Sequence, residues 1–451
     1  MDRNLNLKEK AILSLLEEEN LVEVKKILNS MNCFDIAAFF DTLDKTNLTL
    51  SFNLLTKDNG AKVFPEMDIE QQKLLIEGFS NLELEEIINK IRMDDKVDMI
   101  EELPSNLVKK VLKNSNPKDR AIINTMLNYP KDSAGSVMTT EYLRLKPSMT
   151  VNDAINYIRE VGSDKETIDM CYVIDETRHL IGEVSLRDII LADVNVGITS
   201  IMKRDFIKTT TTIDREEVAH MFSKYDINTM PVVDGENRLV GIITVDDVID
   251  IIEEETTEDM EIMSAVTPSE KPYKQLSVTD LWRNRFPWLL VLLISATFTS
   301  LILMTYEDAL AKYVVLTAFI PMITDTGGNA GSQSASTIIR SLSLKEIGFH
   351  DFFYVLWKEF RVAIACGLTL AAFNFAKLMI IDRLGLSVSL VISMTLFVTV
   401  LIAKAVGSVL PIIADKLGFD PAVMASPLIT TVVDALAILV YLNIAITILG
   451  A

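Results

Sequence analysis

The chain ends in the stretch PAVMASPLITTVVDALAILVYLNIAITILGA, Pro421–Ala451, in which Asp434 is the only charged residue. Such a stretch is long enough to cross roughly 30 Å of hydrocarbon as a helix. A carboxylate near the centre of a bilayer costs roughly 2.5–3.5 kcal/mol on insertion scales, so its surroundings must compensate. On a helix, Ser426, Thr430 and Asp434 recur at every fourth position and share one face. Since Mg²⁺ takes oxygen ligands and usually keeps several waters, this face suits a hydrated hard cation.

A second explanation for Asp434 is a salt bridge inside the membrane. Lys404 directly follows the preceding apolar stretch, Leu384–Ala403. A basic partner at that depth would neutralise the carboxylate without any bound ion. Both explanations remain open on the sequence alone.

Residues 282–451 contain five apolar stretches that predict membrane spans: Phe286–Met304, Tyr313–Thr324, Val362–Ala376 with its flanks, Leu384–Ala403 and Pro421–Ala451. Basic residues lie before the first span and between the second and third: Arg283, Arg285, Arg340, Lys345, Lys358 and Arg361. These two places fall on the same side, and the positive-inside bias puts that side in the cytosol. We therefore expect a multi-pass protein in the lipid of the cell (inner or plasma) membrane, with a cytosolic N-terminus.

The second predicted span runs into IPMITDTGGNAGSQ, Ile320–Gln333. Proline followed by glycines in mid-membrane should weaken or break a helix, and irregular backbone at that depth is tolerated where it lines a cavity. Asn329 and Gln333 lie one turn apart, so both side chains face the same way, and the Asn329 side chain could hold the waters of an ion in such a cavity. The alternative is that the small residues only allow close helix packing; the two interpretations are compatible.

The front of the chain has a different composition from the back. Residues 1–270 carry 52 acidic and 30 basic residues, a balance of −22, whereas residues 271–451 carry 11 and 13. A strongly negative region attracts cations, and the absence of a basic stripe argues against a nucleic-acid partner. The N-terminus has no apolar signal segment, and three distant cysteines do not predict a disulfide framework or a zinc site.

Residues 1–130 predict short helices in series, because apolar residues recur at spacings of three and four, as in Leu82, Ile87, Ile88 and Ile91. Helix starts recur near Asp44, Asp68, Asp94 and Asn116. This pattern is typical of an α-solenoid, in which each unit buries its face on the next.

Residues 136–256 contain a repeat. Val137-Met138-Thr139 opens one copy and Ile201-Met202-Lys203 opens the other, and each copy continues with a helix, an apolar strand, a turn, a strand and a helix. The apolar strands are predicted at Cys171–Ile174 and Met230–Val233. The pattern closely resembles a tandem cystathionine-β-synthase-type (CBS) pair, a fold that senses small ligands. After it, residues 248–281 form either a linker or a long helix, starting near Asp247, that joins this sensor to the membrane part.

Two membrane segments resemble the signatures of the MgtE family of Mg²⁺ transporter-channels. They are FIPMITDTGGNAGSQSASTIIRSLS, Phe319–Ser343, and GSVLPIIADKLGFDPAVMASPLITTVVDALAILVYL, Gly407–Leu442. The resemblance covers the whole chain. It implies an all-α superhelical N domain over residues 1–132, an α/β CBS pair over 133–199 and 200–256, a connecting plug helix with its linker over 247–281, and a five-helix α transmembrane pore domain over 282–451. It also implies a homodimer with the pore on its two-fold axis.

The resemblance also implies roles for individual residues. Asp434 matches the carboxylate that binds hydrated Mg²⁺ in the pore, and the lining would include Gly328, Asn329, Gln333, Asp420, Ser426, Thr430 and Thr431. Some relatives have Asn where this chain has Ser426. Regulatory Mg²⁺ would bridge carboxylates of the cytosolic parts, namely Asp94, Asp98, Asp214, Glu216, Asp226, Asp247, Glu255, Glu258 and Asp259. Some family members bind ATP at the CBS pair, for which Tyr172, Arg187 and Asp188 are the candidates here.

These implications favour a Mg²⁺-selective channel that closes when cytosolic Mg²⁺ binds. A membrane-anchored sensor without ion transport would need neither Asp434 nor the Gly-Gly-Asn segment. An enzyme is disfavoured, because no nucleophile–base pair, phosphate-binding loop or His-rich metal site is present in the sequence. Mn²⁺, Co²⁺ or Ni²⁺ are alternative cargo ions, and the oxygen-only lining favours Mg²⁺ over them.

Overall fold

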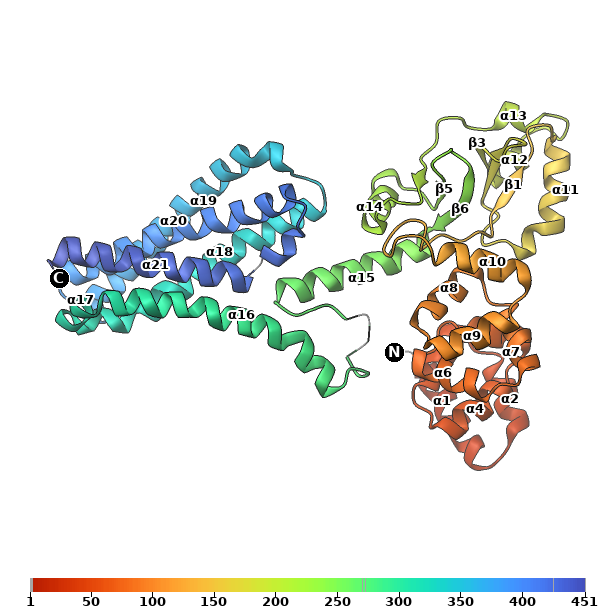
Figure 1. Ribbon diagram of the computed structural model, residues 1–451, viewed down its shortest axis with the longest axis horizontal. Coiled ribbons are helices and arrows are strands. Elements are labelled where there is room, and N and C mark those ends of the chain that lie inside the picture. The colour runs from red at the N-terminus through yellow and green to blue at the C-terminus, as the bar shows by residue number, and fades with distance from the viewer. Residues whose placement is uncertain (1–2, 270, 272, 425, 451) are drawn as a thin grey trace. The chain divides into compact units, whose positions relative to one another are not determined.

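The computed structural model describes residues 3–269, 271, 273–424 and 426–450. The chain divides into two compact units, Met1–Ile251 and Ile252–Ala451, and Figure 1 shows the elements of both.

The first unit begins with short helices in series, as the periodicity predicts. Side chains cap their first turns: Asp44 accepts a hydrogen bond from Thr46 N, Asp68 from Glu70 N and Asn116 from Asp119 N. These are three of the four predicted helix starts. The remaining one, predicted near Asp94, corresponds to α8, which begins at Met93. The bounds are α1 Arg3–Glu17, α2 Leu21–Leu28, α3 Cys33–Phe40, α4 Lys45–Asn53, α5 Lys57–Val63, α6 Ile69–Gly78, α7 Asn81–Ile88, α8 Met93–Glu102, α9 Ser105–Asn114 and α10 Pro117–Met126.

The CBS repeat forms two three-stranded sheets, ordered β1-β2-β3 and β4-β5-β6. In each sheet the first strand is parallel to the second, and the second is antiparallel to the third. The predicted strands are confirmed as β2 and β5, whereas the short strands β1 and β4 were not predicted. The bounds are β1 Leu143–Leu145, α11 Val151–Val161, η1 Gly162–Asp164, β2 Met170–Ile174, β3 Leu180–Ser185, α12 Leu186–Leu191, α13 Ile198–Ile201, β4 Thr209–Thr210, α14 Arg215–Tyr225, β5 Thr229–Val233 and β6 Leu239–Thr244.

The opening motif of each CBS copy pairs with the last strand of the other copy. Thr139 pairs with Ile242 on β6, and Lys203 pairs with Glu183 on β3. The methionine beside each of these residues lies against a glycine: a Cβ on Gly241 would lie 2.5 Å from Met138 Sδ, and one on Gly182 would lie 2.8 Å from Met202 Sδ. The repeated Leu-Val/Ile-Gly pattern therefore reflects the close approach of the partner copy's opening strand.

The connecting segment, residues 248–281, is helical in its first part and again from Val278, so neither of its two interpretations describes the whole segment. Helix α15 spans Val245–Met263 and begins two residues before the predicted start at Asp247. Within the second unit, Ile262 and Met263 of its last turn pack against a buried cluster that includes Ala330 and Val433.

The second unit is mostly long apolar helices. Among the residues that the structure describes, four stretches are long and apolar enough to cross a membrane: Val278–Thr305, Phe349–Ile380, Leu386–Lys416 and Pro421–Leu449. The expected second span is not among them, because its helix lies further along the chain and is more polar. The bounds are α16 Val278–Thr305, α17 Glu307–Lys312, η2 Val314–Phe319, α18 Ile320–Ser343, η3 Phe349–Asp351, α19 Phe352–Ile380, α20 Leu386–Lys416, η4 Pro421–Met424 and α21 Ser426–Leu449.

The expected helix break in the Pro-Gly-Gly segment is wrong, because α18 is a continuous helix. Pro321 sits in its first turn, where a missing N–H costs nothing. The glycines lie on the packed face: a Cβ on Gly327 would lie 2.7 Å from Thr399 Cγ2, and one on Gly328 would lie 2.8 Å from Thr430 Cγ2. Close packing on α20 and α21 therefore outweighs the poor helix propensity of these residues.

The closest approach of α18 to α20 gives a first prediction. A Cβ added to Gly407 would lie 2.2 Å from the backbone oxygen of Gly331, which no rotamer change can move aside. Gly407→Ala must therefore separate the two helices, and we expect a loss of more than about 3 kcal/mol of stability, the upper range for overpacking. Thermal unfolding of the detergent-purified protein measures this loss.

Gly385→Ala is the matched control, because nothing lies within 4 Å of a Cβ at this position. We expect its melting temperature to stay close to that of the wild type. Equal stability of the two variants would contradict the close packing of α18 on α20.

Candidate functional site

Helix α18 has one polar face that is exposed within the described part of the second unit. Its exposed residues include Asp325, Asn329, Gln333, Thr337 and Arg340, spaced three or four apart. The opposite face is buried among the other helices of the second unit. A row of polar side chains on a membrane helix must meet water or protein rather than lipid.

Asp434 lies on α21, half-buried, and interacts electrostatically with Asp325 of α18. Two carboxylates that repel each other in a low-dielectric region favour a cation nearby. Sequence reasoning assigned no role to Asp325, because in the sequence this residue only marks the end of the apolar stretch Tyr313–Thr324. Its position one turn before Asn329 could have indicated the shared face.

Lys404 does not neutralise Asp434, so the salt-bridge explanation is wrong. Its ammonium donates a hydrogen bond to Ser334 Oγ at 3.0 Å and lies 3.8 Å from the carboxylate of Glu359. Asp434 interacts with Asp325, and Lys404 is not part of this pair. The Asp434–Asp325 pair therefore carries two acidic groups that Lys404 does not neutralise.

The other predicted pore residues take several positions. Asn329 and Gln333 are exposed, whereas Gly328 is buried against Thr430. The hydroxyls of Thr430 and Thr431 both donate to the Pro427 carbonyl at 2.9 Å, which leaves their lone pairs as acceptors. The Asp420 carboxylate accepts a hydrogen bond from Ala422 N at 2.7 Å and caps η4. Ser426 begins α21, and its side chain lies outside the described part of the chain.

The first unit contains an acidic cluster where α8 meets the CBS pair and the start of α15. Electrostatic interactions link three groups: Asp94, Asp95 and Asp98 of α8, Asp246 and Asp247 of α15, and the separate residues Glu66, Glu141 and Glu166. Three of the predicted sensor residues, Asp94, Asp98 and Asp247, are therefore together. Sequence reasoning missed Asp95 and Asp246, which are neighbours of predicted residues, and the three glutamates, which come from distant segments.

Burial and mutual repulsion make this cluster costly when it is fully charged. Burial, followed by the charges of its neighbours, raises the pKa of Asp98 to about 8 and that of Asp95 to about 7. Burial is also the main reason that the pKa of Asp247 rises to about 6, although Thr244 Oγ1 donates a hydrogen bond to its carboxylate at 2.6 Å. A divalent cation would replace this repulsion with attraction.

Basic side chains compensate the cluster only in part. Arg92 forms an ion pair with Glu166, and the buried ammonium of Lys96 lies 2.6 Å from Asp119 rather than from the α8 carboxylates. Among the residues that the structure describes, no three His, Cys, Asp or Glu side chains are close enough to enclose a bare metal ion.

The remaining predicted sensor residues lie elsewhere. Asp214 caps α14 by accepting a hydrogen bond from Glu216 N at 2.8 Å. Asp226 ends α14 with a φ of 51° and lines a cavity of the CBS pair. Glu255, Glu258 and Asp259 share one face of α15, on its part within the second unit.

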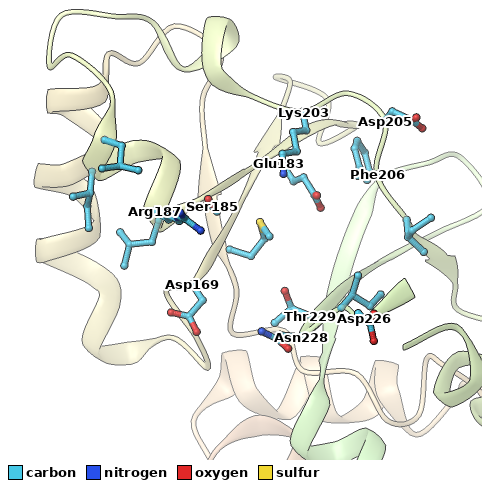
Figure 2. A pocket seen from close by; sticks show the side chains of 16 residues that line it. Asp169, Glu183, Ser185, Arg187, Lys203, Asp205, Phe206, Asp226, Asn228 and Thr229 are labelled. Carbon is cyan, nitrogen blue, oxygen red and sulfur yellow. The ribbon is translucent and has the colours of Figure 1, made fainter. Parts of the chain in front are cut away.

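That cavity has a volume of about 970 Å³ and lies between the two CBS copies (Figure 2). Its lining includes the cations Arg187 and Lys203 and the ring of Phe206. Arg187, one of the three predicted ATP ligands, therefore lies in this lining. Tyr172 is fully buried and donates a hydrogen bond to Thr229 Oγ1, which lines the cavity, whereas Asp188 is absent from the lining. Sequence reasoning missed Lys203 and Phe206, although Lys203 ends the opening motif of the second copy and Phe206 lies three residues after it.

Comparison with known proteins identifies the family. The model of the MgtE divalent cation transporter family matches residues 320–444, that of the MgtE intracellular N domain matches 31–132, and that of the CBS domain matches 134–195 and 198–254. The magnesium transporter MgtE of Thermus thermophilus is 34% identical over 99% of this chain and 100% of its own length. The chain belongs to the MgtE family of magnesium transporters. The MgtE of Bacillus subtilis is 31% identical over 96% of both chains.

Solved MgtE structures resemble the first unit. The crystal structure of the cytosolic domain of the Mg²⁺ channel MgtE in complex with ATP covers 54% of this chain and 99% of its own, with a TM-score of 0.52 and 32% identity. The structure of the soluble part of a magnesium transporter covers 56% of this chain and 99% of its own, with a TM-score of 0.52 and 26% identity. The helical N domain and the CBS pair are thereby confirmed as parts that this chain shares with the cytosolic domain of MgtE. The apolar helices of the second unit are consistent with a multi-pass magnesium transporter.

Proposed function

We propose that this MgtE protein conducts hydrated Mg²⁺ through a path lined by α18 and α21, and that cytosolic Mg²⁺ closes this path. The observation that carries the proposal is the uncovered polar face of α18 beside Asp434. Asp325, Asn329 and Gln333 present oxygen and amide groups where a lipid-facing helix would be apolar. A hydrated divalent ion is a chemically suitable occupant for such a surface.

A second copy of the chain completes this path in the proposal. The polar face of α18 is exposed in one chain, and exposure to lipid would be costly. Two copies related by a two-fold axis would place both faces, and both Asp434 carboxylates, around one aqueous path. In this scheme α18 is the fifth membrane helix, although its composition is more polar than that of the other four.

Mg²⁺ uptake by the purified protein in liposomes tests this function. Uptake above that of protein-free liposomes supports transport, and its absence would contradict the proposal. Parallel assays with Mn²⁺, Co²⁺ and Ni²⁺ measure selectivity. We expect Mg²⁺ to be preferred, because the proposed lining offers oxygen and amide groups and no imidazole or thiol ligand.

The gating part of the proposal assigns the sensor to the acidic cluster. Mg²⁺ bound among Asp94, Asp98 and Asp247 would hold the N domain (residues 1–132) against the CBS pair (133–199 and 200–256) and the start of α15. The plug segment, 247–281, would pass this state to the pore domain, 282–451, since Ile262 and Met263 pack beside Ala330 and Val433. Glu255, Glu258 and Asp259 would supply further Mg²⁺ ligands on α15.

The CBS cavity is the proposed site for ATP. The guanidinium of Arg187 and the ammonium of Lys203 would bind the phosphates, and the ring of Phe206 would contact the base. We expect Arg187→Gln to weaken ATP binding by about tenfold or more, because hydrogen bonds to charged groups contribute about 1.5–3 kcal/mol. Calorimetric titration of the cytosolic fragment, which relatives show to be separately crystallisable, measures this affinity.

Arg159→Gln is the control for this titration, since Arg159 is exposed on α11 and absent from the cavity lining. We expect wild-type affinity in this variant. No ATP binding by the wild-type fragment, or equal binding by both variants, would remove ATP from the proposal.

A further inference from the structure

Three polar side chains meet inside the membrane unit at a place that the ion path does not explain. Lys404 of α20 is 5% exposed and Ser334 of α18 is 2% exposed, and Glu359 of α19 lies beside them. A buried charge in an apolar helix is costly and needs a specific partner. These three residues, called the 334–359–404 junction below, belong to neither the proposed pore face nor the sensor.

Two hydrogen bonds connect the three side chains of the junction, from Lys404 to Ser334 and from Ser334 to Glu359. Lys404 Nζ donates to Ser334 Oγ at 3.0 Å, and Ser334 Oγ donates to Glu359 Oε2 at 2.6 Å. The ammonium and the carboxylate lie 3.8 Å apart. The serine hydroxyl therefore accepts from the cation and donates to the anion, so α18 is joined to both α19 and α20 through one side chain.

The position of the junction on α18 relates it to the ion path. Ser334 directly follows Gln333 and lies on the packed face, whereas Gln333 and Asn329 lie on the exposed polar face. One turn earlier, Gly331 contacts Gly407 of α20, three residues after Lys404. The glycine contact limits the distance between the two helices, and the hydrogen bonds at Ser334 limit the rotation of α18 about its own axis.

We propose that the 334–359–404 junction is a positioning device that holds α18 in the rotation in which Asn329 and Gln333 face the permeating ion. This inference rests on the proposed function, because it assumes that α18 lines the path. If α18 turned about its own axis by the angle between successive residues, these two side chains would move by about 100° around the helix. Lys404, Ser334 and Glu359 are thus positioning residues that contact no ion themselves.

Ser334→Ala is the sharpest test, because it leaves the Lys404–Glu359 ion pair in place and removes only its link to α18. In proteoliposomes we expect the Mg²⁺ concentration for half-maximal uptake, or the preference for Mg²⁺ over Mn²⁺, to change about tenfold, with little change in melting temperature. Ser341→Ala is the matched control on the same helix. Wild-type half-saturation and selectivity in Ser334→Ala would overturn the inference.

A second set of variants separates positioning from stability. Lys404→Met leaves Glu359 as an uncompensated buried charge and should lower the melting temperature, whereas Lys404→Met with Glu359→Met should recover it. We expect the double variant to show the altered selectivity of Ser334→Ala, because Ser334 then has neither Lys404 nor Glu359 as a hydrogen-bond partner. Recovery of both properties would show a purely structural role and overturn the inference. Failure of wild-type uptake would instead overturn the proposed function.

Discussion

Asp434→Asn should lower Mg²⁺ uptake at least about 100-fold, equivalent to roughly 2.7 kcal/mol of lost interaction with the ion. The amide keeps the size of the side chain and removes the negative charge that would attract a divalent cation within the membrane. Asp434 lies beside Asp325 and has no basic partner among the ion pairs of the described residues. The initial rate of uptake into proteoliposomes measures the effect.

Protein abundance distinguishes this result from misfolding. Replacing a carboxylate by an amide removes a cost of membrane insertion, so Asp434→Asn should be produced and purified at least as well as the wild type. Asp308→Asn is a suitable control, because Asp308 is exposed on α17 outside the apolar helices. Uptake at the wild-type rate by a well-folded Asp434→Asn protein would show that the ion path does not pass this carboxylate.

Combined neutralisation of Asp94, Asp98 and Asp247 to asparagine should leave uptake running when the cytosolic side contains millimolar Mg²⁺. In the proposed mechanism the ion bridges these carboxylates, and amides bind a divalent cation far more weakly. The wild type should close under the same conditions. A triple variant of exposed acids, Glu85, Glu160 and Glu176 to glutamine, carries the same change in charge and should close normally. Normal closure of the Asp94/Asp98/Asp247 variant would remove the cluster from the sensor.

Thermal unfolding of the cytosolic fragment gives an independent readout of the same variant. Burial and repulsion hold the pKa of Asp98 at about 8 and that of Asp95 at about 7 in the folded state, above the ordinary value of 3.8. Between the ordinary pKa of 3.8 and these raised values, the folded fragment therefore binds more protons than the unfolded chain. Its stability without Mg²⁺ consequently falls as the pH rises from 3.8 to about 8. Mg²⁺ should stabilise the wild type most at about pH 8. The triple asparagine variant should be more stable without Mg²⁺ and gain little from it.

Features that depend on neighbouring residues were predictable from the sequence. Helix starts at Asp44, Asp68 and Asn116 follow from side chains that bond to the next turn, and the CBS strands follow from short apolar runs between turns. The periodicity also correctly predicted burial of Ile87 and Ile88 on α7 and of Ile91 just after it, although Leu82 of α7 is 74% exposed. Local patterns report which face of an element is apolar, and they do not report what covers it.

Features that depend on distant residues needed the tertiary structure. The partner of Lys404 is Glu359 on another helix rather than Asp434, and α18 stays helical because α20 and α21 pack against its glycines.

The sequence alone determined the order of the parts, the CBS repeat, the apolar helices and the isolated carboxylate Asp434. Only the tertiary structure decided which acids gather with Asp94, Asp98 and Asp247, that Asp226 lines the CBS cavity, and that Asp325 lies near Asp434. The physical reason is that hydrogen bonding and amphipathicity act over a few residues, whereas repulsion, burial and ion pairing depend on distances that only the folded chain defines.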